Sequence, residues 1–146
     1  MQTCRVRFVE ALPALICLLL AGCGVRYVAD YDQTIVDGVS AFLAQSESFF
    51  SLLERHAGTE ATAYENCTSF YEEATTDLRM LMVHADAIPQ DSITSEQLSI
   101  LMVSLDTLES IHRRGNLTPA QIEGSLRPSF ESSCRSILTF EYAKKR

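Results

Sequence analysis

The sequence is poor in the residues that most often shape turns or support chemistry, and these scarcities exclude several kinds of protein. Its 146 residues include only six glycines, four prolines and three histidines. No glycine belongs to a G-x-S-x-G turn or a phosphate-cradling loop, so neither a serine triad of that kind nor a glycine-loop nucleotide site is indicated. No stretch has the period-two alternation of a strand, so we expect little or no β-structure.

Positive charge is also scarce. Twelve Lys and Arg residues stand against nineteen Asp and Glu residues, which gives a formal net charge of −7. The basic residues form no stripe along the chain, and this argues against nucleic acid as a partner. The same acidity argues against broad electrostatic binding to anionic lipid, so any attachment to a membrane must be covalent.

Long apolar runs are missing as well, and the longest apolar segment lies near the start of the chain. It covers residues 11–21, is interrupted by Pro13, and follows Arg5 and Arg7. A transmembrane helix needs about 20 apolar residues, so this segment is too short to span a bilayer. A basic leader, a short apolar run and small residues together predict a secretory signal peptide over residues 1–22.

The signal peptide ends in the sequence L-A-G-C at residues 20–23. This motif resembles the bacterial lipobox, in which the Cys thiol receives a diacylglycerol and becomes the first residue after cleavage. The resemblance extends over residues 1–23 and departs from the usual pattern at Glu10 and Pro13. It implies that Cys23 is lipidated, with acyl chains such as palmitate that contribute about 0.8 kcal/mol per buried CH2.

The lipobox also implies a domain organisation and a location. Residues 23–29 would form a lipidated tether, and residues 30–146 a helical domain. Gly24 follows the lipidated cysteine where an Asp favours inner-membrane retention, so the resemblance implies an outer-membrane lipoprotein facing the periplasm. Removal of residues 1–22 leaves 124 residues with a formal charge of −8, a length that suits one domain.

Two of the five cysteines are candidates for a disulfide. Cys4 and Cys17 would leave with the signal peptide and Cys23 would be acylated, which leaves Cys67 and Cys134. In an oxidising periplasm an isolated pair is expected to form a disulfide. A metal site is the competing interpretation, but there is no C-x-x-C motif and no histidine within five residues of either cysteine.

Helical periodicity begins at the start of the predicted domain. The first helix is expected to start at Asp30 or Asp32, either of which is a good N-cap, and to stop before Gly58. The second is expected to start near Thr62, where T-A-Y-E forms a capping box, and to end at Pro89. The apolar positions of the first are Ile35, Val39, Phe42, Phe49 and Leu53, and those of the second are Tyr64, Cys67, Tyr71, Ala74, Leu78, Leu81, Ala85 and Ile88.

Two further helical segments follow. Thr94 and Gln97 predict a capping box at the start of a third helix that closes before Gly115. The sequence T-P-A-Q at residues 118–121 places an N-cap, a proline at the first helical position and a glutamine at the third, which is a strong start signal. The apolar face of the third helix is Leu98, Leu101, Leu105 and Leu108, continued by His112.

The connections between these segments are short, so the sequence predicts an all-α fold: an antiparallel up-and-down bundle of four main helices closed by one disulfide. A single straight helix from Thr118 would place Cys134 about 16 Å too far along the bundle to meet Cys67. A disulfide requires Cα atoms within about 7 Å. We therefore predict a break at residues 126–128, with a short helix at 118–126 lying across the bundle end.

The three histidines raise the question of a metal site. Glu109 and His112 form an E-x-x-H pair, half of the motif of di-iron bundles, and a weak site could combine them with His56 and Glu54. No second E-x-x-H is present, and His84 is expected at the opposite end of the bundle. Histidines near helix C-termini also complement the helix dipole, so we predict no resident metal and no cofactor.

The last three residues, Lys144, Lys145 and Arg146, have two interpretations. They could contact anionic headgroups, because the last helix is expected to run back toward the membrane. They could equally complement the dipole at the C-terminus of that helix.

The predicted function follows from the anchor rather than from a catalytic motif. The chain resembles the small helical lipoproteins of proteobacteria, which implies a membrane-anchored, non-catalytic module that binds a protein of unknown identity or serves envelope structure. Two narrower alternatives are a pilotin-like chaperone, which would hold a secretin helix in a hydrophobic groove, and an immunity or exclusion lipoprotein. The alternative from another class is a metal- or small-ligand-binding bundle.

Overall fold

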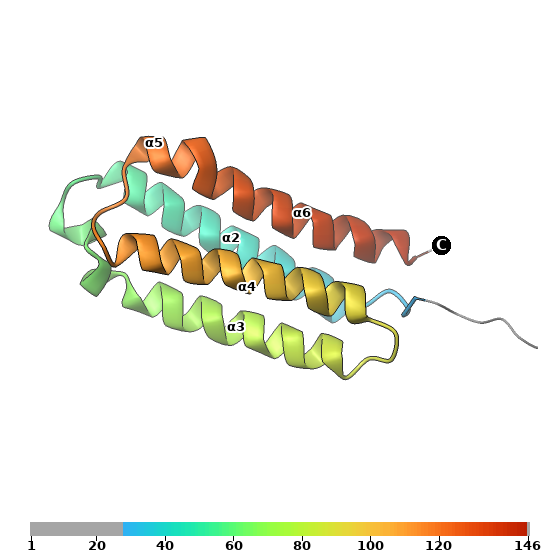
Figure 1. Cartoon of the computed structure of the whole chain (residues 1–146). Helices are drawn as coiled ribbons and strands as arrows, with labels where there is room; N and C mark the ends of the chain where they lie inside the picture. The colour runs from blue at the N-terminus through green and yellow to red at the C-terminus, as the bar shows by residue number, and fades with distance from the viewer. Residues whose placement is uncertain (1–27, 146) are drawn as a thin grey trace, which may run out of the picture.

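The computed structural model describes residues 28–145, which form a bundle of four long helices (Figure 1). These are α2 (Gln33–Arg55), α3 (Thr68–Asp86), α4 (Ser92–His112) and α6 (Arg127–Ala143). Successive long helices run in opposite directions, and the described residues contain no strand. The predicted all-α, up-and-down bundle is therefore confirmed. The signal peptide, Cys23 and most of the tether lie outside the described residues.

The four helices occupy the corners of a square in which α3 and α6 are diagonal. Helix α3 packs against α2 and α4, and α6 packs against the same two helices. The described chain begins and ends at one end of the bundle, which we name the proximal end; it also carries the loop 87–91 (Figure 1). The loops 56–67 and 113–118 lie at the other end, the distal end.

The apolar stripes predicted from the sequence form the core. Asp32 is the N-cap of α2, and its Oδ1 accepts the backbone N–H of Thr34 at 2.7 Å and of Ile35 at 3.3 Å. All the predicted apolar positions of α2 and α4 are buried, and those of α3 are buried from Tyr71 to Ala85. The largest fully buried side chains include Tyr71, Phe42, Phe50, Phe130, Ile35, Leu53, Leu78, Leu98, Leu101, Leu105 and Leu108.

The predicted start of the second helix is wrong. Residues 60–67 form two 3-10 turns, η1 (Glu60–Thr62) and η2 (Tyr64–Asn66), and α3 begins only at Thr68. Thr62 does not cap a helix, because its side chain is buried and its hydroxyl donates to the carbonyl of Thr59 at 2.9 Å. A side chain from α4, His112, also binds the carbonyl of Thr62, and this contact could not be read from local sequence.

The capping box predicted for the third helix is also wrong, whereas the one for the last helical segment is confirmed. Helix α4 begins at Ser92, so Thr94 and Gln97 lie inside it and bind partners on α6 instead. At Thr118 the hydroxyl accepts the backbone N–H of Gln121, and the Gln121 side chain accepts the backbone N–H of Thr118 in return.

The predicted break at residues 126–128 is wrong. Helix α5 (Pro119–Gln121) continues through a π-helical segment, η3 (Ile122–Leu126), directly into α6, and the backbone at its boundaries stays in the right-handed helical region. A π segment widens one turn, so it accommodates Pro128, which has no N–H to donate and whose ring would crowd the carbonyl four residues earlier. The guanidinium of Arg127 then donates to Glu54 at 2.9 Å and ties this segment to α2.

The predicted disulfide is also absent. Cys67 and Cys134 are both free and are not at disulfide distance. Cys67 precedes the first turn of α3, whereas Cys134 lies within α6, at the diagonal corner of the bundle. Burial raises the pKa of the Cys67 thiol, and it raises the pKa of the Cys134 thiol to about 12. Both cysteines therefore act as small apolar core residues.

Candidate functional site

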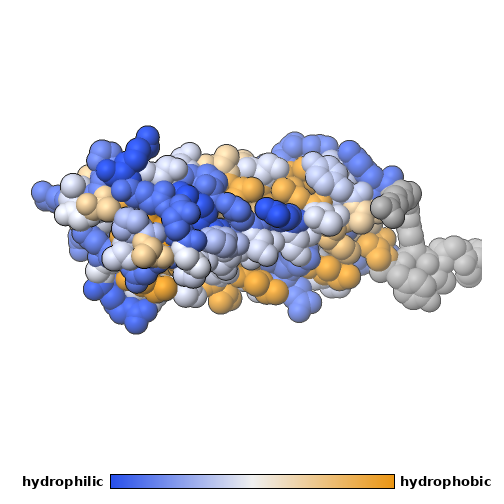
Figure 2. Space-filling view, turned by 90° about the horizontal axis from the view of Figure 1, so that it is seen from above, coloured by the Kyte–Doolittle hydropathy of each residue, from blue (hydrophilic) through white to orange (hydrophobic). Residues whose placement is uncertain are grey.

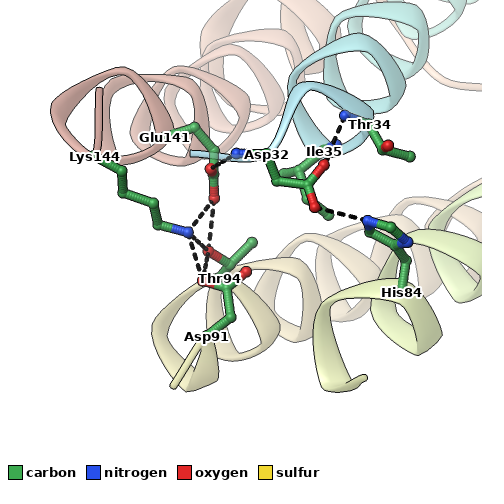
Figure 3. Close-up of polar contacts among 8 residues, drawn as sticks. All are labelled: Asp32, Thr34, Ile35, His84, Asp91, Thr94, Glu141 and Lys144. Atoms are coloured by element: carbon green, nitrogen blue, oxygen red, sulfur yellow. Dashed lines mark hydrogen bonds and ion pairs between the residues drawn. The ribbon is translucent and has the colours of Figure 1, made fainter. Parts of the chain in front are cut away.

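Two polar clusters interrupt the apolar core, one at each end of the bundle. The proximal cluster joins all four long helices and is drawn in Figure 3. The distal cluster surrounds His112 and borders a polar cleft between α3 and α4. The proximal end is closed by internal contacts. The distal end has a cleft whose side chains can contact a ligand.

The proximal cluster is built around an ammonium group that is removed from water. The side chain of Lys144 is 1% exposed, and its Nζ lies 2.5 Å from Asp91 Oδ1 and 2.6 Å from Glu141 Oε1. It also donates to Thr94 Oγ1 at 3.0 Å. Glu141 continues the network to α2, because its Oε2 accepts the backbone N–H of Asp32 at 3.2 Å. One buried lysine thus links α6 to the start of α4, and Glu141 extends the link to the start of α2.

The same cluster reaches α3 through a histidine. His84 Nε2 lies 2.8 Å from Asp32 Oδ2, so the side chain that caps α2 also binds the last turns of α3 (Figure 3). Burial raises the pKa of Asp32, but the hydrogen bonds from His84 and from the backbone N–H groups of Thr34 and Ile35 outweigh it, and the net shift is downward. His84 therefore binds a carboxylate in addition to sitting near a helix C-terminus.

The structure gives Lys144 and Lys145, two of the three C-terminal cations, different surroundings. Lys144 points into the bundle and is engaged by Asp91 and Glu141, so its ammonium is not free to contact a headgroup. Lys145 stays at the surface, with its Nζ 4.2 Å from the centre of the Tyr31 ring. Arg146 lies outside the described residues.

The distal cluster fixes His112 in one tautomer. His112 is 1% exposed, and its Nε2 lies 2.8 Å from the carbonyl oxygen of Thr62. A carbonyl only accepts, so Nε2 carries the proton, and Nδ1 accepts the hydroxyl of Tyr71 at 2.8 Å. Burial is the main cause that raises the pKa of Tyr71, so its hydroxyl stays protonated as a donor. His112 thereby holds the 3-10 turns against α3 and α4.

Beside this buried pair lies a charged triad at the surface. Arg113 Nη2 donates to Glu109 Oε1 at 2.6 Å and to Tyr64 Oη at 2.7 Å, and Tyr64 Oη donates to Glu109 Oε1 at 2.6 Å. The hydrogen bond to Glu109 is the largest cause that raises the pKa of Tyr64, and Arg113 opposes it. The triad borders a cleft of about 410 Å³ between α3 and α4. The cleft is lined by Tyr64, Thr68, Tyr71, Glu72, Thr75, Thr76, Arg79, Glu109 and Arg113.

The residues of the weak metal hypothesis are directed to different partners. Both ring nitrogens of His112 are occupied, Glu109 binds Tyr64 and Arg113, and Glu54 binds Arg127 on α6. Among the residues that the structure describes, no group of three or more His, Cys, Asp or Glu side chains is arranged to hold a metal ion. The structure therefore does not bring the E-x-x-H pair together with other ligands.

A second hollow lies between α2 and α6. It measures about 350 Å³, and its walls combine apolar groups, including Leu43 and Leu138, with charges at the rim. The full lining is Leu43, Glu47, Glu131, Arg135, Leu138, Thr139 and Tyr142. This groove is more apolar than the cleft beside the charged triad.

The contacts of Glu141, Thr62 and Asp91 were not predicted from the sequence. Glu141 gave the clearest signal, because it continues the spacing of Phe130, Cys134 and Ile137 and so places an acid on the buried face of the last helix. An acid on such a face needs a buried partner, and a lysine three residues later is in reach. The role of Asp91 depends on a contact with Lys144, which is distant in sequence, and no local pattern marks it. The T-A-Y-E pattern marks Thr62 but predicts the wrong contact, because His112 binds its carbonyl.

Comparison with known proteins identifies no relative. No protein family, no curated protein and no solved structure matches the chain. Between residues 28 and 145, no helix combines the length and the apolar character needed to cross a membrane.

Proposed function

We propose that this chain is an outer-membrane lipoprotein that faces the periplasm, is anchored by acyl chains on Cys23, and binds a protein partner without catalysing a reaction. The observation that supports it most is the position of the first described residues. Ala29 donates its backbone N–H to the carbonyl of Gln90 at 3.3 Å, which places the start of the domain beside the proximal loop 87–91. The lipobox cysteine lies only five residues before Val28.

This arrangement gives the bundle a direction. An anchor at Cys23 would hold the proximal end close to the bilayer and leave the distal half exposed to the periplasm. The cleft beside Tyr64 and Arg113 lies in that distal half, because it is lined by the first turns of α3 and the last turn of α4. A mixture of aromatic and arginine side chains around a hollow is typical of residues that dominate protein interfaces. We therefore propose this cleft as the partner site.

The anchor is tested by mass spectrometry of the chain expressed with its leader in a Gram-negative host. We expect an N-terminal Cys23 that carries fatty acids, recovered from the outer-membrane fraction. The matched variant Cys23→Ser should lose both the fatty acids and the membrane location. An intact leader, or a terminus without fatty acid, would contradict the proposal.

The partner site is tested by placing a photo-crosslinking amino acid at two exposed positions in living cells. Thr76 lines the cleft, whereas Ser48 lies on α2 and is not among the residues that line it. We expect a discrete adduct from position 76 and none from position 48, with the adduct weakened by Arg113→Ala. Equal crosslinking from both positions would show that the cleft is not the contact surface.

The groove between α2 and α6 supports a second, narrower candidate, the pilotin-like chaperone. Leu43 and Leu138 give this groove the apolar walls that an amphipathic helix requires. The test is a titration of fluorescent C-terminal secretin peptides into the purified protein. Saturable binding that Leu138→Glu weakens would support the chaperone role, and the absence of any change in anisotropy would end it.

A further inference from the structure

The proximal end carries an exposed apolar side chain near each of the four long helices. Val28 lies on the segment that enters α2, Val83 in the last turn of α3, Ile93 in the first turn of α4 and Tyr142 in the last turn of α6. Their exposed fractions range from 37% for Val28 to 70% for Val83. We name these four residues the apolar collar. Four separate segments of sequence therefore bring apolar groups to the surface at the same level of the bundle.

The distal end has no comparable feature among the described residues. The exposed large apolar side chains are Val28, Leu52, Met80, Val83, Ile93, Ile100, Val103 and Tyr142. Of these, Leu52 alone lies within about one helical turn of the distal end. Figure 2 shows more hydrophobic surface in the half toward the grey trace, whereas hydrophilic side chains predominate at the opposite end. The exposed apolar surface is thus concentrated toward the start of the described chain.

An aromatic and cationic group adjoins the collar. The rings of Tyr31 and Tyr142 stack with their centres 6.2 Å apart. Lys145 Nζ lies 4.2 Å from the centre of the Tyr31 ring and 5.6 Å from that of Tyr142. Tyrosine rings, and lysines whose apolar stem can lie along apolar surface while the ammonium reaches water, favour the boundary between lipid chains and water.

We propose that the apolar collar, with Tyr31 and Lys145, is a membrane-contact surface that inserts into the interfacial layer of a phospholipid bilayer. The inference rests on the proposed anchor at Cys23 and extends it from attachment to orientation. The bundle would stand with the collar in the headgroup region and its axis directed away from the bilayer.

The length of the tether is the main argument for lipid as the occupant. Val28 lies five positions after Cys23 in the sequence. Even a fully extended chain spans no more than about 3.5 Å per residue, so an acylated Cys23 would keep Val28 within roughly 18 Å of the membrane interface. The acidic chain gains little from anionic headgroups, so the contact would depend on apolar and aromatic burial and be insensitive to salt.

The test uses tryptophan as a depth reporter, because the chain contains none. Tyr142→Trp places the reporter in the collar, and the control Leu52→Trp places one about 30 Å further along the bundle. Each variant of the full lipidated chain is reconstituted into vesicles of phosphatidylcholine with brominated acyl chains, and circular dichroism verifies its helix content. We expect bromine to quench the reporter at position 142, equally in high salt, and to leave the reporter at position 52 unquenched.

A second arm separates this inference from the proposed anchor. The chain from Cys23 onward, which contains the whole described core, is coupled through Cys23 to a maleimide phospholipid; Cys67 and Cys134 are buried and do not compete. If cells do not acylate Cys23, the proposed function fails. The chemically coupled form then tests by itself whether the apolar collar contacts the bilayer.

Two results would overturn the inference: no quenching of the reporter at position 142 in either anchored form, or equal quenching of the reporters at positions 142 and 52. The double substitution Val83→Asp with Ile93→Asp places two carboxylates in the collar without touching the reporter. Loss of quenching at position 142 in that variant, with its helix content retained, would support the inference.

Discussion

The ammonium of Lys144 lies 2.5 Å from the carboxylate of Asp91, and both side chains are almost completely excluded from water. Asp91 immediately precedes α4 and Lys144 follows the end of α6, so this ion pair joins two segments that are distant in sequence. A buried charge costs several kcal/mol unless it is paired, and here Glu141 and Thr94 complete the pairing. The proximal end therefore depends on one residue near the C-terminus.

We predict that Lys144→Met lowers the free energy of unfolding by about 3–5 kcal/mol, because it leaves Asp91 and Glu141 buried without a cation. Urea titration followed by circular dichroism measures this loss. The matched control is Lys145→Met, which removes an exposed ammonium one residue later and should change stability by less than about 0.5 kcal/mol. Equal effects from the two variants would show that Lys144 is not buried as described.

The cap at Asp32 predicts a dependence of stability on pH. The pKa of Asp32 is lowered in the folded state from its ordinary value of 3.8. Its ionised carboxylate therefore stabilises the fold above that value, and the contribution is lost as the pH falls through the lower folded pKa. We expect Asp32→Asn, which keeps a capping side chain, to be less stable than the natural protein at pH 6, with the difference shrinking below about pH 4. Urea titrations at a series of pH values measure the difference, and a constant difference would contradict the assignment.

The buried thiols predict resistance to alkylation. Burial raises the pKa of Cys134 to about 12 and also raises the pKa of Cys67, so little thiolate is present at pH 8. Iodoacetamide should leave both residues unmodified in the folded protein and modify both in guanidinium chloride, as mass spectrometry can count. Protein isolated from an oxidising compartment should give the same count. A mobility shift on reduction would instead reveal the disulfide that the structure lacks.

The hydroxyl of Tyr71 predicts a loss of stability at the distal end. Tyr71→Phe keeps the ring but leaves Nδ1 of the buried His112 without a donor, which we expect to cost about 1–3 kcal/mol. Thermal unfolding measures the loss. Tyr64→Phe is the matched control, because it removes a hydroxyl from the exposed triad and should have a smaller effect.

Local sequence patterns predict the helices and their buried faces correctly. Contacts between segments that are distant in sequence are not predicted correctly. The apolar spacing of Leu98, Leu101 and Leu105 predicts one face of α4 correctly because a helix repeats its own geometry. The capping boxes at Thr62 and Thr94 fail because each threonine finds a different hydrogen-bond partner in the folded chain. The predicted disulfide is wrong because the expected cellular compartment and the number of cysteines do not determine which corner of the bundle each thiol occupies.

The candidate site follows the same division. The helix directions were predictable from short loops, and they define which end a lipidated Cys23 would hold. The closed network around Lys144 and the cleft beside Tyr64 were not predictable, because each is assembled from side chains of separate segments. Glu141, an acid in an apolar stripe, is the residue whose sequence position indicates that a buried charge needs compensation.

The widened turn at Ile122–Leu126 sets the phase of everything that follows it. Ile122 and Phe130 are both buried, yet eight residues of regular α-helix would rotate them about 80° apart. Because the π-helical turn holds one more residue than an α-helical turn, the side chains of Ile122 and Phe130 lie within about 20° of each other around the helix axis. If this turn kept all its residues but took regular α-helical geometry, Phe130, Cys134 and Glu141 would rotate away from the core together, whereas excising one residue would leave them in phase with Ile122. The alignment of the final helix is therefore decided upstream of its own first residue.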